Sequence, residues 1–240
     1  MDFIFLIGQT GVGKSTTLDA LLRSEQRLVL LPNRRKLADD IIIPQMQTEL
    51  GEAVGAVSDR VERFRLTAAY REKNLGGMVH ALQTYFSNAK LDKAQTYVFD
   101  NIRGLEECTA ALEHFPASRF IFLNAPPFIR LQRLLVRSDS FDEVAAERPG
   151  NTLFTENLEE IDNASDAFDF CEIARLEANS NYSDEAILKA VRIISAEFKN
   201  YNADAAATYL MSRLDKPQLL YLDTSKLSID EVSSRIQGWL

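Results

Sequence analysis

The sequence predicts an α/β fold in three layers, with a central, mostly parallel five-stranded sheet and a helical insertion before the last strand. The first observation is that five short segments are apolar throughout, which is typical of strands buried on both faces of a parallel sheet. The second is that helical periodicity separates these segments, as the crossovers between parallel strands require. The five segments are 3–7, 28–31, 97–99, 120–123 and 219–222.

The motif after the first predicted strand carries the strongest functional signal. Residues 8–15 read Gly-Gln-Thr-Gly-Val-Gly-Lys-Ser, which fits the P-loop pattern G-x-x-x-x-G-K-[ST], and a helical run follows directly. Backbone N–H groups of such a loop and the helix dipole attract phosphates, and a lysine adds positive charge. The hydroxyl of the serine is suited to ligate Mg²⁺. We therefore expect ATP and Mg²⁺ as cofactors, held by Gly8, Gln9, Thr10, Gly11, Val12, Gly13, Lys14, Ser15 and Thr16.

Three further segments, together with this loop, resemble the P-loop kinase group, the nucleotide and nucleoside kinases related to adenylate kinase. Residues 97–104 are similar to the strand and D-G-x-P-R element of that group, with Asn101 and Ile102 in place of Gly and Pro. Residues 123–137 are similar to the segment that leads into their lid, and residues 222–225 to their closing strand. The resemblance implies a P-loop NTPase fold and a kinase that transfers the γ-phosphoryl group of Mg·ATP to a small, nucleotide-like acceptor.

The catalytic residues are predicted from position and from this resemblance. Asp100 ends an apolar strand, so its carboxylate should lie beside the P-loop and hold Mg²⁺ together with Ser15, unless it caps the following turn. The resemblance implies that Arg103 contacts phosphate. It also implies that Arg133 and Arg137 contact ATP and the transferred group, although the stripe they form with Arg130 also fits solvated surface. Lys14, Asp100, Arg103, Arg133 and Arg137 form the predicted catalytic set.

The acceptor site is expected between the second and third predicted strands. Arg34 and Arg35 follow a strand and could clamp an anionic substrate, or could be part of a solvated loop. Asp59 and Arg60 are the other candidates for substrate binding. Asp59 also fits a helix N-cap, because Glu62 follows three residues later. The acceptor itself is not identified by these patterns.

The last two helices have clear start signals. Ser183 precedes apolar residues at helical spacing from Ile187 onward, so it is predicted to cap a helix. Ser228 and Glu231 form a capping-box pattern, which predicts that the final dozen residues are helical.

Charge divides the chain into two parts. Residues 139–185 carry 14 acidic and two basic side chains, so this stretch has a net charge of −12 and the rest of the chain has +4. We expect residues 139–215 to form a helical acidic insertion, either a lid or a surface for a protein partner. Residues 1–138 and 216–240 then form the nucleotide-binding core.

Composition limits the partners and the compartment. The chain has 240 residues, of which 46% are hydrophobic, and its longest apolar run is far shorter than the roughly 20 residues of a membrane span. A net charge of −8 argues against nucleic acid and membrane as partners. With no signal-peptide pattern and two isolated cysteines, we expect a cytoplasmic protein with reduced thiols.

A second function from another class fits the same loop. A P-loop ATPase or nucleotide-dependent switch could act on a protein partner through the acidic insertion. The sequence lacks the L-S-G-G-Q and N-K-x-D motifs, and Asn101 follows Asp100 where many hydrolytic ATPases have a second acid. These features favour the kinase.

Overall fold

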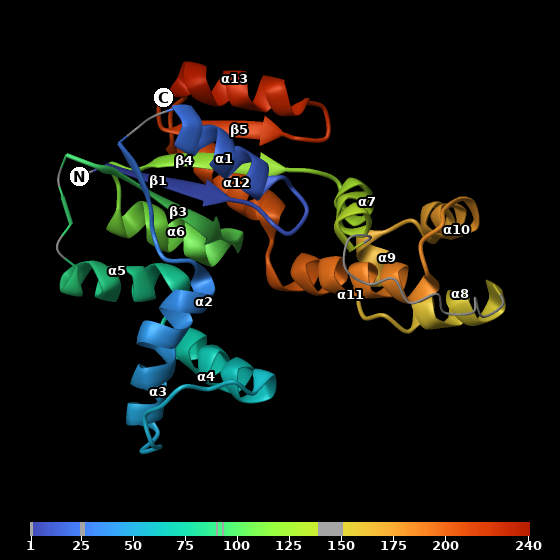
Figure 1. Cartoon of the computed structure of the whole chain (residues 1–240), viewed down its shortest axis with the longest axis horizontal. Helices are drawn as coiled ribbons and strands as arrows, with labels where there is room; N and C mark the ends of the chain where they lie inside the picture. The colour runs from blue at the N-terminus through green and yellow to red at the C-terminus, as the bar shows by residue number, and fades with distance from the viewer. Residues whose placement is uncertain (1, 25–26, 90, 93, 139–150) are drawn as a thin grey trace.

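The computed structural model describes residues 2–24, 27–89, 91–92, 94–138 and 151–240 (Figure 1). At its centre is a sheet of five strands, all parallel, in the order β2-β3-β1-β4-β5. The strands are β1 (Asp2–Ile7), β2 (Leu28–Leu30), β3 (Thr96–Ile102), β4 (Arg119–Asn124) and β5 (Leu219–Asp223), and each overlaps a predicted segment.

The three central strands, β3, β1 and β4, are buried on both faces, as their apolar sequences predict. The edge strands β2 and β5 are partly exposed, which corrects the expectation for residues 28–31 and 219–222. In β1, Phe3, Phe5 and Ile7 belong to one hydrophobic core, whereas Ile4 and Leu6 belong to another. This alternation follows from the two-residue period of a strand. Each core needs its own layer of helices, which gives three layers.

Helices cover both faces of the sheet. α1 (Lys14–Ser24) and α13 (Ile229–Trp239) contact each other and bury Leu21 and Ile236 against the face of Ile4. The opposite face is covered by α5 (Met78–Asn88), α6 (Gly104–His114) and α12 (Ala203–Arg213). This three-layer arrangement, with a glycine-rich loop between β1 and α1, confirms the predicted P-loop NTPase-like fold.

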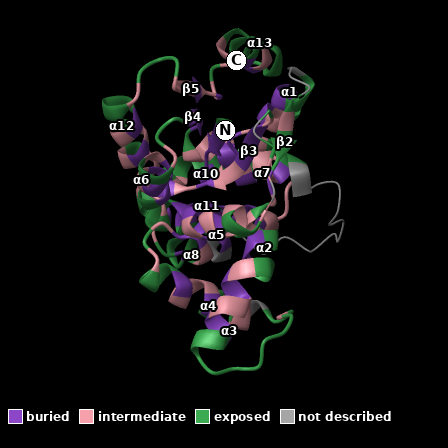
Figure 2. Ribbon diagram, turned by 90° about the vertical axis from the view of Figure 1, so that its left-hand side faces the viewer, coloured by how far each residue is buried: buried purple, intermediate pink, exposed green. Residues whose placement is uncertain are grey.

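The connection from β2 to α5 forms a helical extension at one edge of the sheet (Figure 1). It contains α2 (Arg34–Leu37), a π-helical turn (Ala38–Ile42), α3 (Ile43–Glu49) and α4 (Arg60–Lys73). Met46 and Tyr70 of this extension are fully buried and belong to the same core as Phe5. Figure 2 shows the exposed loop that joins α3 to α4 beyond this core.

A helical subdomain, α7–α11, extends away from the sheet (Figure 1). Its helices are α7 (Pro127–Ser138), α8 (Asn151–Glu159), α9 (Ala164–Ala167), α10 (Phe170–Asn179) and α11 (Asp184–Asn200). They enclose a separate hydrophobic core, which includes Leu131, Phe154, Ile173 and Val191. As predicted, Ser183 caps α11, since its hydroxyl accepts a hydrogen bond from the N–H of Ala186.

The insertion expected over residues 139–215 is helical where it is described, but it does not all join this subdomain. α12 contributes Ala206 and Leu210 to the core beneath the sheet. Residues 139–150 lie outside the described ranges. None of the helices in the described ranges combines the length and apolar composition that crossing a bilayer requires.

Candidate active site

The P-loop occupies residues 8–13 between β1 and α1, and glycines make its path possible. Gly11 and Gly13 have φ values of 83° and 97°, in a region that other residues rarely adopt. A Cβ atom on Gly11 would lie 2.8 Å from the carbonyl oxygen of Arg130 in α7. Gly11 therefore serves two purposes, because it permits both the turn and the close approach of α7.

Lys14, the first residue of α1, folds back over this loop. Its Nζ donates hydrogen bonds to the carbonyl oxygens of Gly8, at 2.8 Å, and Gln9, at 2.9 Å. Burial, and next the charge of Arg103, lower the pKa of Lys14 to about 8, although Asp100 and Glu197 act to raise it. The lowered pKa shows that the charged form of Lys14 lacks sufficient negative charge around it, so an anion placed at this loop would stabilise it.

Asp100 lies near the carboxyl end of β3, two residues before its last residue, and its charge acts on Lys14. Burial raises the pKa of its carboxyl group, whereas the charges of Lys14 and Arg103 act to lower it. Its Oδ1 is buried and has no hydrogen-bond partner. A buried carboxylate oxygen without a partner fits a cation site, and with the Ser15 hydroxyl it supplies the oxygen ligands that Mg²⁺ prefers. Among the described residues there is no cluster of three or more His, Cys, Asp or Glu that could hold a metal ion.

A bulge at Asn101 explains how the chain turns here. Leu6 of β1 pairs with Asp100 and Ile7 pairs with Ile102, so Asn101 is an extra residue in β3. Its φ is 109°, which glycine adopts more easily. Asn101 stands where the D-G-x-P-R element of the kinases has glycine, and it adopts this backbone conformation at some cost in strain.

Three residues from distant parts of the chain meet above the loop. Glu197, near the end of α11, accepts hydrogen bonds from Arg103 Nη1 at 2.7 Å and from Arg130 Nη2 at 2.5 Å. Arg130 is 1% exposed, although its sequence pattern placed it on a basic stripe with Arg133 and Arg137. Glu197 was not predicted as a site residue. The available signal was its position three residues after Ile194 on the buried stripe of α11, where a charged residue needs partners.

Glu197 and Arg130 together bind every polar group of Thr10. The N–H and Oγ1 of Thr10 donate to the Glu197 carboxylate at 2.9 and 2.6 Å, and its carbonyl accepts from Arg130 Nε at 2.7 Å. The same subdomain residues therefore fix this part of the P-loop. In addition, Gln9 Nε2 donates to the carbonyl of Tyr201 at 3.2 Å.

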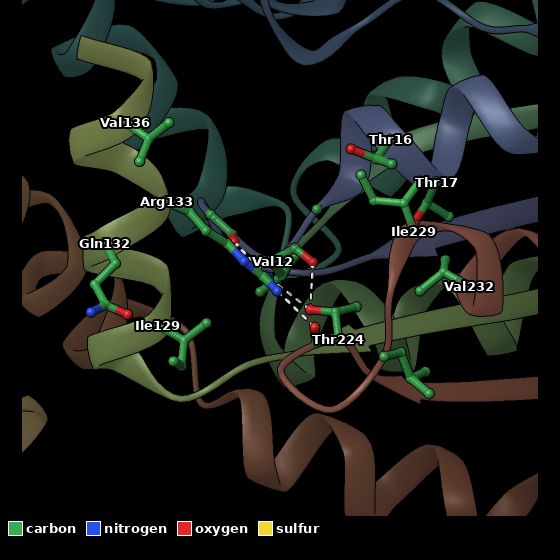
Figure 3. A pocket seen from close by; sticks show the side chains of 13 residues that line it. Val12, Thr16, Thr17, Ile129, Gln132, Arg133, Val136, Thr224, Ile229 and Val232 are labelled. Carbon is green, nitrogen blue, oxygen red and sulfur yellow. Dashed lines mark hydrogen bonds between the residues drawn. The ribbon is translucent and has the colours of Figure 1, made fainter. Parts of the chain in front are cut away.

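A cavity of about 430 Å³ adjoins the other side of the P-loop (Figure 3). Arg133 reaches from α7 across its edge and donates to Gly11 O at 3.2 Å, Thr224 Oγ1 at 2.9 Å and Thr224 O at 2.6 Å. Most of the wall is apolar, which suits the flat ring of a ligand. The lining residues are Gly11, Val12, Gly13, Thr16, Thr17, Ile129, Gln132, Arg133, Val136, Thr224, Leu227, Ile229 and Val232.

Of the residues predicted for the acceptor, Arg34 borders the cluster of Asp100 and Arg103, because its partner Glu107 also accepts from the N–H of Arg103 at 2.8 Å. Arg34 Nη1 donates to the carbonyl oxygen of Asn101 at 2.8 Å and pairs with the buried carboxylate of Glu107 at 2.7 Å. Arg35 is exposed on α2. Asp59 caps α4, because its carboxylate accepts from the N–H of Glu62 at 2.8 Å. The side chains of Arg60 and Arg137 lie outside the described part of the structure.

The structure thus brings Lys14, Asp100 and Arg103 together and adds Arg130 and Glu197 to them. It places Arg133 at the cavity and Arg34 in an ion pair with Glu107. The arrangement combines a glycine-rich loop, positive charge, a buried carboxylate and a neighbouring apolar cavity.

Comparison with known proteins gives distant structural likeness alone. No protein-family model matches the chain, and no curated protein is similar to it in sequence. A sulfotransferase from Alicyclobacillus acidocaldarius superposes with a TM-score of 0.41 at 12% identity, over 98% of this chain and 80% of that chain. A candidate kinase from Chloroflexus aurantiacus J-10-fl superposes with a TM-score of 0.41 at 17% identity, over 100% of this chain and 98% of that chain.

Proposed function

We propose that the protein is an ATP-dependent kinase that transfers the γ-phosphoryl group of Mg·ATP to a small, nucleotide-like acceptor. The observation that carries this proposal is the position of Asp100. Its unpartnered, buried carboxylate oxygen lies with Lys14 and Arg103 at the P-loop, and the apolar cavity adjoins the other side of the same loop. These are the groups that positioning and neutralising a phosphoryl group require.

The cavity and the loop suggest how ATP is held. The adenine ring occupies the apolar cavity between α7 and the start of α13, and the phosphates then lie against the backbone N–H groups of residues 8–16. Lys14 exchanges its two carbonyl partners, Gly8 and Gln9, for phosphate oxygens. Arg133 already joins Gly11 to Thr224, so its part is to keep the loop beside the cavity.

Transfer in this proposal depends on positive charge around the phosphoryl group. Ser15 and Asp100 would hold Mg²⁺. When it is bound, this cation neutralises negative charge on the phosphate oxygens. Arg103 contributes guanidinium donors, and loss of one such donor costs about 10²–10³ in rate. Arg35 is the exposed candidate for contact with the acceptor, while Arg34 and its partner Glu107 support the bulge at Asn101.

A second candidate function has one specific observation in its favour. Glu197 and Arg130 belong to the helical subdomain and bind Thr10 of the P-loop. A nucleotide-dependent switch needs such a connection between the loop and a partner surface. Stimulation of ADP release by a protein partner, and by no small acceptor, would support this switch in place of the kinase.

The test has two parts. ATP at a hundredfold excess over its Kd should stabilise the protein by about 2.7 kcal/mol, and Lys14→Ala should abolish most of that gain. Lys73→Ala, in a salt bridge on α4, is the matched control and should keep it. A screen of nucleotides, nucleosides and small metabolites for acceptor-dependent ADP formation then identifies the substrate. An unchanged ATP effect in Lys14→Ala would refute the assignment of the P-loop.

A further inference from the structure

The Glu197 carboxylate has two oxygens in different surroundings. Oε2 accepts from Arg130 Nη2 and from the N–H of Thr10, and the side chain of Arg130 is 2% exposed. Oε1 accepts from Arg103 Nη1 and from Thr10 Oγ1, and the side chain of Arg103 is 23% exposed. The side chain of Arg130 is therefore enclosed, whereas that of Arg103 is partly exposed.

Arg103 is only partly satisfied by Glu197. Its Nε is buried and has no hydrogen-bond partner, and its guanidinium lies 5.7 Å from the centre of the Tyr201 ring. A guanidinium group can present two parallel N–H donors to one anion, an arrangement that a single carboxylate oxygen at Nη1 does not complete. The parallel donors that include Nε are Nε and Nη2, and Glu197 bonds to neither, so an anion that reached Nε would gain donors that Glu197 leaves unused.

The charges in this cluster also favour the binding of an anion. Lys14, Arg103 and Arg130 carry positive charge in this cluster, whereas Asp100 and Glu197 carry negative charge. A buried cation without a counter-ion is strongly unfavourable, so Glu197 supplies negative charge while no phosphate is bound. A bound phosphate chain can take over from Glu197 as the counter-ion of these cations. Its negative charge also repels the Glu197 carboxylate.

We propose that Glu197 is a positioning residue that holds Arg103 until an anionic ligand binds at the P-loop. The ligand then takes Arg103 from Oε1, while Arg130 and the Thr10 N–H keep Oε2. This inference rests on the proposed function only in that a phosphate chain binds at the loop. It assigns Glu197 the role of an internal competitor for phosphate, which sets how tightly the loop binds its ligand.

The test measures binding of tripolyphosphate, the phosphate chain of ATP without base or ribose, to the full chain by titration calorimetry. Glu197→Gln removes the competing charge, and the Kd should fall about tenfold. If Glu197 instead merely supported the loop, the same variant would bind more weakly. Equal or weaker binding by the folded variant would therefore overturn the proposal.

Two further variants separate this role from stability and from general charge effects. Glu197→Asp keeps a charge for Arg130 but is one methylene shorter, so it should also lower the Kd, by a smaller factor. Glu185→Gln makes the same change about 18 Å away along α11 and should leave the Kd unchanged. An unchanged Kd in Glu197→Asp, or an equal fall in Glu185→Gln, would contradict the role of Glu197.

A double-mutant cycle shows whether Glu197 acts through Arg103. In an Arg103→Gln background, Glu197→Gln should lose most of its gain, and a gain retained in full would refute the mechanism. These measurements also separate the role of Glu197 from the kinase proposal. Tighter binding without any phosphorylated acceptor would support the inference and count against the kinase. A wild-type protein that binds no tripolyphosphate would overturn both.

Discussion

Lys14 shows how the surroundings of one residue set its charge. The pKa of Lys14 is about 8 because its ammonium group is buried beside Arg103. Between pH 7.5 and 9.5 the unliganded protein loses this charge, whereas the terminal phosphate of ATP is already ionised. The Kd for ATP should therefore rise about tenfold over this range, and calorimetry at several pH values can measure it.

The variant Lys14→Met provides the control for this pH dependence. It should bind ATP weakly with little change over the same range. The free energy of unfolding gives an independent check of the sign. Because the folded protein holds the Lys14 proton less tightly than the unfolded chain does, this lysine should make stability rise with pH from about 8 towards 10.5. A Kd for ATP that stays constant with pH would contradict the lowered pKa.

The sequence predicted those site residues whose positions depend only on neighbouring parts of the chain. The loop glycines, Lys14 and Asp100 could be placed because their geometry follows from a strand, a turn and a helix in succession. Glu197 could not, since its partners Arg130 and Arg103 are 67 and 94 residues away along the chain. Pairing over such distances depends on tertiary packing. Arg34 shows the same limit, because its pairing with Glu107 spans 73 residues.

Among the helices, α13 allows a direct test of capping. Ser228 and Glu231 form the predicted capping box, in which the Ser228 hydroxyl accepts from the N–H of Glu231 and the Glu231 carboxylate accepts from the N–H of Ser228. Ser228→Ala should lower the free energy of unfolding by about 1 kcal/mol in urea titrations. Since Ile229 and Val232 line the cavity, fraying of this end should also raise the Kd for ATP.

The matched control for this change is Ser234→Ala. Ser234 is exposed within the same helix, and alanine there should leave stability equal or slightly higher. A similar loss of stability in both variants would show that the cap is not the cause.

The elements that could be predicted are those whose signal is periodic or lies at a cap. All five strands and the starts of α11 and α13 belong to this group. α12 was expected within the insertion because an apolar helical face does not reveal which surface it will cover. Its Ala206 and Leu210 fit equally well against any apolar layer, and only the fold places them beneath the sheet.

For the whole molecule, the two cores predict how ATP affects different regions. α8–α10 pack in the subdomain core, and the described part of this stretch is strongly acidic, so phosphates should not draw it inward. We expect hydrogen exchange with and without ATP to show protection in residues 8–16 and around residue 197. Exchange in residues 151–179 should be unchanged.

Protection of residues 151–179 by ATP would contradict this expectation and support closure of a lid. The sequence already separated an acidic stretch from a basic remainder, because charge can be counted without a structure. The sequence did not show whether this acidic stretch is a lid or a surface for a protein partner. That choice depends on where the stretch lies relative to the P-loop.

α11 also has a mechanical consequence. It contains 17 residues and is therefore about 25 Å long, with its last turn against the P-loop and its first turn in the subdomain. Tyr201 and Asn202 alone join it to α12, which stays packed on α6. A tilt of about 10° at this joint would swing the far end of α11 through about 4 Å. The subdomain helices packed on α11 would move with it as one body, so a small shift where Glu197 meets Thr10 would be enlarged at the far end of the subdomain.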